Sequence, residues 1–183
     1  MRIVDIQDKI DHELLSHDQI MEKISEAAQQ ASKDYAGRVP LLVCVLKGAV
    51  NTLTAFSQAM SIPLEMDFMS LSSYGSGTST SGKVTVRQDL STDVRGRDVL
   101  IVDSGVTLSW LVNELKRRGA ASVEIFALLE KPARHQVQLD VKYKGFVIPD
   151  EFVVGFGLDF DEEYRNLDSI AVLKPEVYEG ELA

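Results

Sequence analysis

Two patterns of hydrophobic residues alternate along the chain: helical spacing predicts helices, and short apolar or alternating runs predict strands. Between Ser16 and Gly37, apolar residues recur at helical spacing and Gln19 completes a capping box with Ser16, so we expect a helix there. Residues 41–46 form an unbroken apolar run, which is typical of a strand buried on both faces of a parallel sheet. A second helix of about three turns is expected to follow and to end at Met60.

Shorter strands are predicted on both sides of the middle of the chain. From Leu64 onward, apolar residues alternate with Glu65 and Asp67, the pattern of a half-exposed strand. Val84 and Val86 resume a strand, and further strands are expected at 122–129, 141–147, 152–156 and 170–173. Strands that alternate with helices predict an α/β fold with a doubly wound parallel sheet, and the strand-rich end predicts a small cap over its carboxyl edge.

The central stretch, residues 98–119, combines a buried strand, a short polar turn and a helix. Four consecutive apolar residues end at Val102, the turn contains Gly105, and an apolar stripe with a basic last turn precedes Gly119. A helix that begins after such a turn presents free backbone N–H groups to an anion. We therefore interpret the turn as a phosphate site, with an ordinary capped turn as the alternative.

The segment 72–82 consists almost entirely of Ser, Thr and Gly. Such a composition cannot pack a core, so the segment is either a linker between domains or an active-site lid. The lid is favoured because a strand resumes directly afterwards, and a long loop inside a compact domain is usually functional.

Composition narrows the class of protein. A length of 183 residues fits one domain with a substantial core, and 45% of the residues are hydrophobic. The net charge of −9 argues against a nucleic-acid-binding surface. The single cysteine, Cys44, is expected to be a core residue, in an apolar run too short to cross a membrane. Acidic residues near the N-terminus do not suit a signal peptide, so a soluble cytoplasmic protein is expected.

The run VLIVDSGVTLS resembles the ribose-phosphate signature of the type I phosphoribosyltransferases, and neighbouring motifs narrow the resemblance to the hypoxanthine-guanine phosphoribosyltransferase family. The resemblance implies transfer of the 5-phosphoribosyl group from phosphoribosyl pyrophosphate to a 6-oxopurine, hypoxanthine or guanine, in purine salvage. It implies magnesium (Mg2+) as cofactor, small-molecule substrates, no nucleic-acid or membrane partner, and a homodimer or homotetramer.

The resemblance also assigns roles to the residues of the turn. Asp103 matches the family's candidate acid/base group near purine N7. The positions that match the 5′-phosphate-binding residues are Asp103, Ser104, Gly105, Val106 and Thr107.

Two segments match residues that bind pyrophosphate. Lys47 and Gly48 match a loop that contacts pyrophosphate and often carries a non-proline cis peptide, although Lys47 by itself would be an ordinary exposed lysine. Ser73 and Tyr74 match residues of the family's lid, which closes over the pyrophosphate and keeps water from the sugar cation.

The acidic run 158–165 and three earlier positions, Lys131, Phe152 and Val153, complete the match. In that run, which otherwise reads as a solvated loop, Asp159 matches a magnesium ligand and Arg165 matches a pyrophosphate-binding arginine. Lys131, Phe152 and Val153 match the purine slot. An ammonium donates hydrogen bonds and cannot accept them, so Lys131 would favour a 6-oxo over a 6-amino group. Without the resemblance, Lys131 is a turn lysine and Phe152 a core aromatic.

One feature departs from the family pattern. Family members carry two adjacent acidic residues, with apolar companions, between the buried strand and the Asp-Ser/Thr-Gly turn, whereas Val102 here runs directly into Asp103. In the family these acids accept hydrogen bonds from the ribose hydroxyls. Their absence predicts either a strand that ends early or a turn drawn toward the sheet. It leaves a catalytically impaired ligand-binding variant as an alternative, beside an RNA-binding attenuation regulator on the same fold.

The resemblance predicts a single phosphoribosyltransferase domain over residues 1–183. Its core is expected at about 16–130 and 165–175, and its cap, or hood, at about 131–164 together with the N-terminal segment.

Overall fold

The fold is built on a six-stranded sheet. The computed structural model describes residues 1–73, 84–103, 108–132 and 140–178. The strands of the sheet, in spatial order, are β4 (Val84–Gln88), β3 (Glu65–Ser73), β2 (Leu41–Leu46), β5 (Asp98–Asp103), β6 (Ser122–Glu130) and β7 (Tyr143–Val147). Neighbouring strands run parallel from β3 to β7, and β4 is antiparallel to β3.

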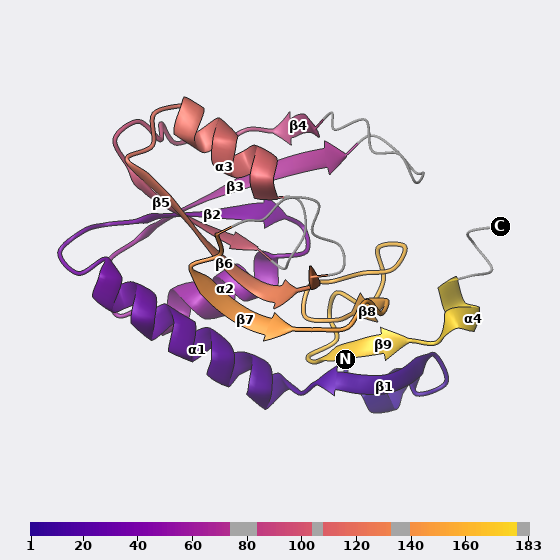
Figure 1. Ribbon diagram of the computed structural model, residues 1–183. Helices are drawn as coiled ribbons and strands as arrows, with labels where there is room; N and C mark the ends of the chain where they lie inside the picture. The colour runs from indigo at the N-terminus through magenta and orange to yellow at the C-terminus, as the bar shows by residue number, and fades with distance from the viewer. Residues whose placement is uncertain (74–83, 104–107, 133–139, 179–183) are drawn as a thin grey trace.

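Helices cover both faces of this sheet (Figure 1). α1 (His17–Asp34) and α2 (Val50–Ala59) lie on one face, and α3 (Leu108–Arg117) lies on the other. The Ser16 hydroxyl accepts a hydrogen bond from the Gln19 N–H, which confirms the predicted capping box. Two separate hydrophobic clusters fill the two layers, one under α1 and α2 and one under α3. The predicted doubly wound arrangement is confirmed.

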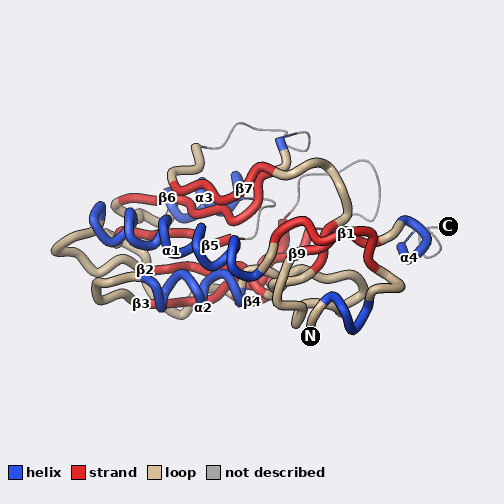
Figure 2. The backbone as a smooth tube through the Cα atoms, turned by 90° about the horizontal axis from the view of Figure 1, so that it is seen from below, coloured by secondary structure: helices blue, strands red, loops and turns tan. Residues whose placement is uncertain are grey.

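A second, three-stranded sheet forms the cap. Its antiparallel strands are β1 (Ile10–Leu15), β9 (Ile170–Leu173) and β8 (Val153–Val154), in that order. A 3-10 helix (Ile3–Ile6) and α4 (Pro175–Tyr178) accompany it. Figure 2 shows this sheet beyond one end of the six-stranded sheet, with both described ends of the chain beside it.

Two strands belong to a different sheet from the one that the expected boundaries of core and cap gave them. β7 was expected in the cap but extends the six-stranded sheet beside β6, and β9 was expected in the core but pairs with β1 and β8. The strand expected at 152–156 is also shorter, because Gly155 and Phe156 have positive φ angles and turn the chain away from β9. Strand periodicity predicts a strand without naming its partner, which is why these assignments were wrong.

The predicted strand from Leu64 to Phe68 is confirmed, but its polar residue Asp67 is buried and its apolar residue Met66 is half-exposed. The Asp67 carboxylate accepts hydrogen bonds from the backbone N–H groups of Phe68 and Thr92, both at 2.8 Å. Burial raises the pKa of Asp67, but these hydrogen bonds outweigh it and hold the pKa below its ordinary value. The acid therefore ties β3 to the segment that leads into β5.

Two expectations from composition can be compared with the structure. Cys44 is fully buried in β2, as predicted, and burial followed by the charge of Asp103 raises its pKa to about 12. None of the helices in the described ranges is long and apolar enough to cross a membrane.

Candidate active site

Three candidate residues lie at the carboxyl ends of neighbouring parallel strands. Lys47 follows β2, Asp103 is the last residue of β5, and Lys131 follows β6. Because β2, β5 and β6 are adjacent and parallel, their carboxyl ends meet at one edge of the sheet. In doubly wound folds, ligands bind outside this edge, and the cap lies beyond this end of the sheet (Figure 1).

Asp103 belongs to the strand rather than to the turn. It pairs with Ala127 of β6, and its side chain is only 5% exposed. β5 therefore does not end before Asp103, so the prediction of an early strand end is wrong. α3 begins at Leu108, so the predicted strand and the predicted helix of this stretch are confirmed. The phosphate-binding candidates Ser104, Gly105, Val106 and Thr107 lie outside the described residues.

The loop after β2 is packed against the cap. The Leu46–Lys47 peptide is cis, as the family resemblance led us to expect. A Cβ atom added to Gly157 would lie 2.2 Å from the Gly48 carbonyl oxygen, so the two backbones can approach this closely only because residue 157 is glycine. The Asn51 side chain on α2 also donates a hydrogen bond to the Arg165 carbonyl. These contacts bring the loop after β2 and the acidic run together.

Four charged side chains meet where these segments touch. The Lys47 ammonium lies 2.7 Å from a carboxylate oxygen of Glu162, and the Arg165 guanidinium lies 3.3 Å from the same oxygen. Arg165 also pairs with Asp159 at 2.9 Å. The structure thus brings together three residues that the resemblance assigned to pyrophosphate and magnesium, namely Lys47, Arg165 and Asp159.

Glu162 is a member of this cluster that the sequence reasoning missed. The hydrogen bond from Lys47, followed by that from Arg165, lowers the pKa of the Glu162 carboxyl. Glu162 is therefore ionised at neutral pH and neutralises part of the positive charge. Its sequence context, a run of acidic residues, gave no signal that it would reach Lys47, 115 positions away along the chain.

The candidate purine residues form a second group. Lys131 follows β6, and its ammonium donates a 2.6 Å hydrogen bond to the backbone carbonyl of Glu151. Phe152 and Val153 come directly after Glu151, so the expected base-reading amine contacts the segment that carries the expected stacking ring. The side chains of Lys131, Phe152 and Val153 are all partly exposed. A ligand can therefore reach them without unfolding the cap.

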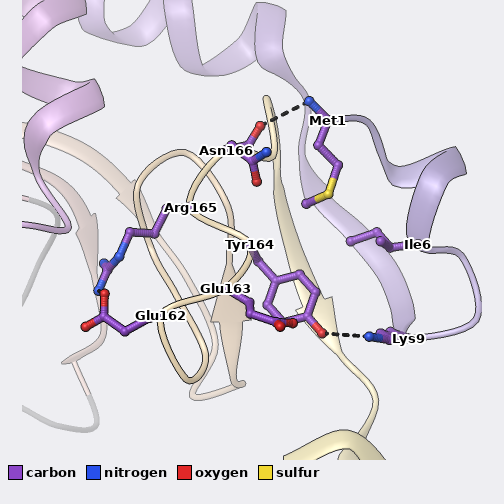
Figure 3. Close-up of a pocket in the computed structure, with 8 residues that line it drawn as sticks. All are labelled: Met1, Ile6, Lys9, Glu162, Glu163, Tyr164, Arg165 and Asn166. Carbon is purple, nitrogen blue, oxygen red and sulfur yellow. Dashed lines mark hydrogen bonds and ion pairs between the residues drawn. The ribbon is translucent and has the colours of Figure 1, made fainter.

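A hollow on the cap borders the charged cluster, since Glu162 and Arg165 are among its lining residues. It has a volume of about 450 Å³ and is lined by residues of the N-terminal segment and of the run 162–166. Figure 3 shows the Glu162 and Arg165 side chains pointing away from Lys9 and Met1, while Tyr164 points toward Lys9 and its hydroxyl accepts a hydrogen bond from the Lys9 ammonium. The Glu162 and Arg165 side chains thus extend away from the N-terminal residues that line the hollow, and we do not assign it to the substrates.

The structure says less about the two lid candidates and about the candidate magnesium ligand. Ser73 ends β3, next to β2 in the sheet, whereas Tyr74 lies outside the described residues. Among the residues that are described, no three His, Cys, Asp or Glu side chains are grouped so as to hold a metal ion. A magnesium ion bound through a substrate needs only one or two protein carboxylates, because phosphate oxygens and water complete its shell. Asp159, partly exposed beside Arg165, has the oxygen donors for that role.

Comparisons with known proteins show which family this chain resembles. The family model for the phosphoribosyl transferase domain matches residues 12–161. The chain is 47% identical over 169 residues to the hypoxanthine-guanine phosphoribosyltransferase of Streptococcus thermophilus, covering 90% of this chain and 94% of that protein. It is 51% identical over 169 residues, 90% of this chain, to the bifunctional protein TilS/HprT of Listeria monocytogenes, of which it spans only 26%. A crystal structure of a hypoxanthine phosphoribosyltransferase from Staphylococcus aureus matches with a TM-score of 0.91 and 38% identity, covering 94% of this chain and 96% of that one.

Proposed function

The chain belongs to the phosphoribosyltransferase family, and we propose that it transfers the 5-phosphoribosyl group from phosphoribosyl pyrophosphate to hypoxanthine or guanine in purine salvage. The observation that carries the proposal is the placement of Lys47, Asp103 and Lys131 at three adjacent strand ends. In the reaction, a purine ring nitrogen forms a bond to the anomeric carbon while the bond from that carbon to pyrophosphate breaks. The transition state has the oxocarbenium character of glycoside chemistry.

Asp103 is the proposed acid/base residue for the purine. Its carboxyl group is fixed by the strand, because the residue pairs with β6, and its low exposure keeps water away. A base fixed in this way can accept the proton that the purine loses at N7. The turn that follows, Ser104, Gly105, Val106 and Thr107, is proposed to hold the 5′-phosphate.

The charged cluster is proposed to bind pyrophosphate. Lys47 supplies a point charge, Arg165 supplies a planar fork that suits phosphate oxygens, and Gly48 lets the ligand approach the backbone. Asp159 would hold Mg2+, which neutralises the negative charge on the leaving pyrophosphate. Ser73 and Tyr74 are proposed to close over it from the lid.

The second group is proposed to read the base. Lys131 donates to the 6-oxo group, Phe152 stacks on the purine ring, and the Val153 carbonyl contacts the substituent at C2. The 2.6 Å contact between Lys131 and the Glu151 carbonyl supports this proposal, because it holds the amine against the residue that precedes Phe152.

The location and the oligomeric state of the protein are also proposed. We propose a cytoplasmic homodimer or homotetramer, since the related structures include a Trypanosoma cruzi hypoxanthine phosphoribosyl transferase analysed for its oligomeric state. Sedimentation of the purified chain tests this part separately from its activity.

A turnover experiment tests the proposed activity. The purified chain is supplied with phosphoribosyl pyrophosphate, magnesium and hypoxanthine, and pyrophosphate release is followed with wild type and with Asp103→Asn. We expect release from the wild type and a rate lower by about a hundredfold or more in the variant, the usual range for removal of an acid/base group. Equal rates would show that Asp103 is not that group.

A further inference from the structure

We propose that Tyr178 is a positioning residue for the purine: it stacks on one face of Phe152 and thereby holds the other face ready for the base. The inference rests on the proposed function, in which Phe152 stacks on the purine ring. Tyr178 lies at the end of α4. It belongs to none of the motifs to which the family resemblance assigns a role in the site.

The geometry of the aromatic group carries the inference. The rings of Phe152 and Tyr178 are nearly parallel, at 20°, with their centroids 4.8 Å apart. Phe160 meets Phe152 edge-on, at 88° and 5.6 Å. Offset stacking and edge-to-face contact are the two favourable arrangements of aromatic rings. Phe152 is therefore held by two rings in different directions.

The chain after β9 places Tyr178 beside Phe152. The Leu173 N–H donates to the Phe152 carbonyl at 3.0 Å, so the last residue of β9 is bonded to the residue before β8. Lys174 is tied to the N-terminal segment by a hydrogen bond from its N–H to the Lys9 carbonyl. Pro175 then begins α4, at the helix position where proline is favoured. The short helix is anchored at its start, which fixes where Tyr178 lies.

Holding Phe152 in advance affects binding of the base. An aromatic ring has two faces, and Tyr178 covers one of them while the ring stays partly exposed. Binding is weaker when a side chain must lose conformational freedom to bind the ligand. Fixing the ring beforehand removes this entropic cost, which corresponds to about two- to tenfold in affinity for one side chain. Glu151, next in sequence to Phe152, accepts the hydrogen bond from Lys131. The donor for the 6-oxo group and the stacking ring are thus held in one segment.

Equilibrium binding separates positioning from general packing. The full chain and the variants Tyr178→Leu, Tyr178→Phe and Phe152→Leu are titrated calorimetrically with inosine 5′-monophosphate and, separately, with pyrophosphate and magnesium. Tyr178→Leu keeps an apolar side chain but removes the ring, whereas Tyr178→Phe keeps the ring. Melting temperatures are recorded for each variant, and Tyr178→Met replaces Tyr178→Leu if the latter is unfolded at the assay temperature.

The expected result is selective. Tyr178→Leu should bind inosine 5′-monophosphate about two- to tenfold more weakly, with pyrophosphate affinity unchanged and with Tyr178→Phe restoring the wild-type value. Unchanged or tighter nucleotide binding by Tyr178→Leu would overturn the inference, and so would an equal loss for both ligands. If Phe152→Leu leaves nucleotide affinity unchanged, the proposed stacking itself fails. If Phe152→Leu weakens nucleotide binding and Tyr178→Leu does not, only the role of Tyr178 fails.

Discussion

The Lys47 ammonium and the Glu162 carboxylate lie 2.7 Å apart, so a cation proposed to bind pyrophosphate is paired with an acid of its own chain. Both side chains are well exposed, at 64% and 63%. An exposed pair of this kind is weak and can be broken by a ligand. If Lys47 and Arg165 bind pyrophosphate as proposed, we expect Glu162 to compete with the pyrophosphate oxygens for both.

Removing the charge of Glu162 should strengthen pyrophosphate binding. Because exposed ion pairs are worth about 0.2–1 kcal/mol, Glu162→Gln should lower the dissociation constant for magnesium pyrophosphate by about one and a half- to fivefold. Glu163→Gln is the matched control, since it removes the same charge one residue away and Glu163 makes no ion pair with Lys47. Calorimetric titration measures both, and equal effects would show that only the overall charge matters.

The competition should depend on pH in a defined direction. Lys47, and then Arg165, lower the pKa of Glu162 from 4.5, so the contact is fully present above that pH and is lost as the pH falls through the lowered pKa. The difference in pyrophosphate affinity between wild type and Glu162→Gln should therefore be constant near neutral pH and shrink in acid. A difference that grows as the pH falls would contradict the assignment.

The close approach of Gly157 to Gly48 predicts a substitution that affects stability and pyrophosphate binding together. Gly157→Ala places a Cβ atom 2.2 Å from the Gly48 carbonyl at a φ of +102°. We expect a loss of about 2 kcal/mol or more in the free energy of unfolding, and weaker pyrophosphate binding.

Gly37→Ala is the control for this clash. Gly37 also has a positive φ, +77°, but nothing lies within 4 Å of an added Cβ atom. It should cost only about 1 kcal/mol and leave pyrophosphate binding unchanged. Equal losses in the two variants, measured by urea unfolding, would mean that backbone strain rather than contact between the loops decides the effect.

The contact of Lys131 with the Glu151 carbonyl supports a prediction about base choice. Lys131→Gln replaces a group that only donates by an amide that also accepts, so discrimination between 6-oxo and 6-amino purines should fall. We expect the ratio of kcat/KM for hypoxanthine to that for adenine to decrease by about tenfold or more, the effect of one polar contact.

Lys144→Gln serves as the matched control, because Lys144 lies on β7 and approaches Glu130 rather than Glu151. Its base preference should equal that of the wild type. If adenine remains equally poor in Lys131→Gln while hypoxanthine is used normally, Lys131 does not read position 6.

The direct junction of Val102 and Asp103 predicts a gain of function. Val102 is followed directly by Asp103 at the end of β5, so no acidic pair stands between the buried strand and Asp103 to contact the ribose hydroxyls. Inserting Glu-Asp and two apolar residues between Val102 and Asp103 should raise kcat, because misplacement of a reacting group by about 1 Å can cost on the order of a hundredfold. Inserting Gln-Asn with the same two residues controls for chain length. A higher kcat with both insertions would assign the gain to spacing rather than to the acids.

Much of the fold could be predicted because its signals are local. The capping box at Ser16, the apolar run of β2 and the stripe of α3 each determine one element without reference to the rest of the chain. Partnership between strands is not local. β1 and β9 are joined across most of the sequence, so the composition of the cap could not be read from strand patterns.

Some residues of the candidate site could be predicted from the sequence and others could not. Lys47, Asp159 and Arg165 matched family positions and are together in the structure. Glu162 and Tyr178 were missed, because a charge in an acidic run and an aromatic near the end of the chain show nothing of the partners that folding gives them. Asp67 shows the same limit, since a carboxylate can be buried wherever backbone N–H groups satisfy it.

Steady-state turnover with hypoxanthine, guanine, xanthine and adenine, each with phosphoribosyl pyrophosphate and with or without magnesium, tests the proposed function most directly. Pyrophosphate release should require magnesium, should occur with hypoxanthine or guanine, and should be far slower with adenine, because Lys131 can only donate to position 6. Equal rates with adenine and hypoxanthine, or no release with any purine by a chain that still binds inosine 5′-monophosphate, would contradict the proposed function.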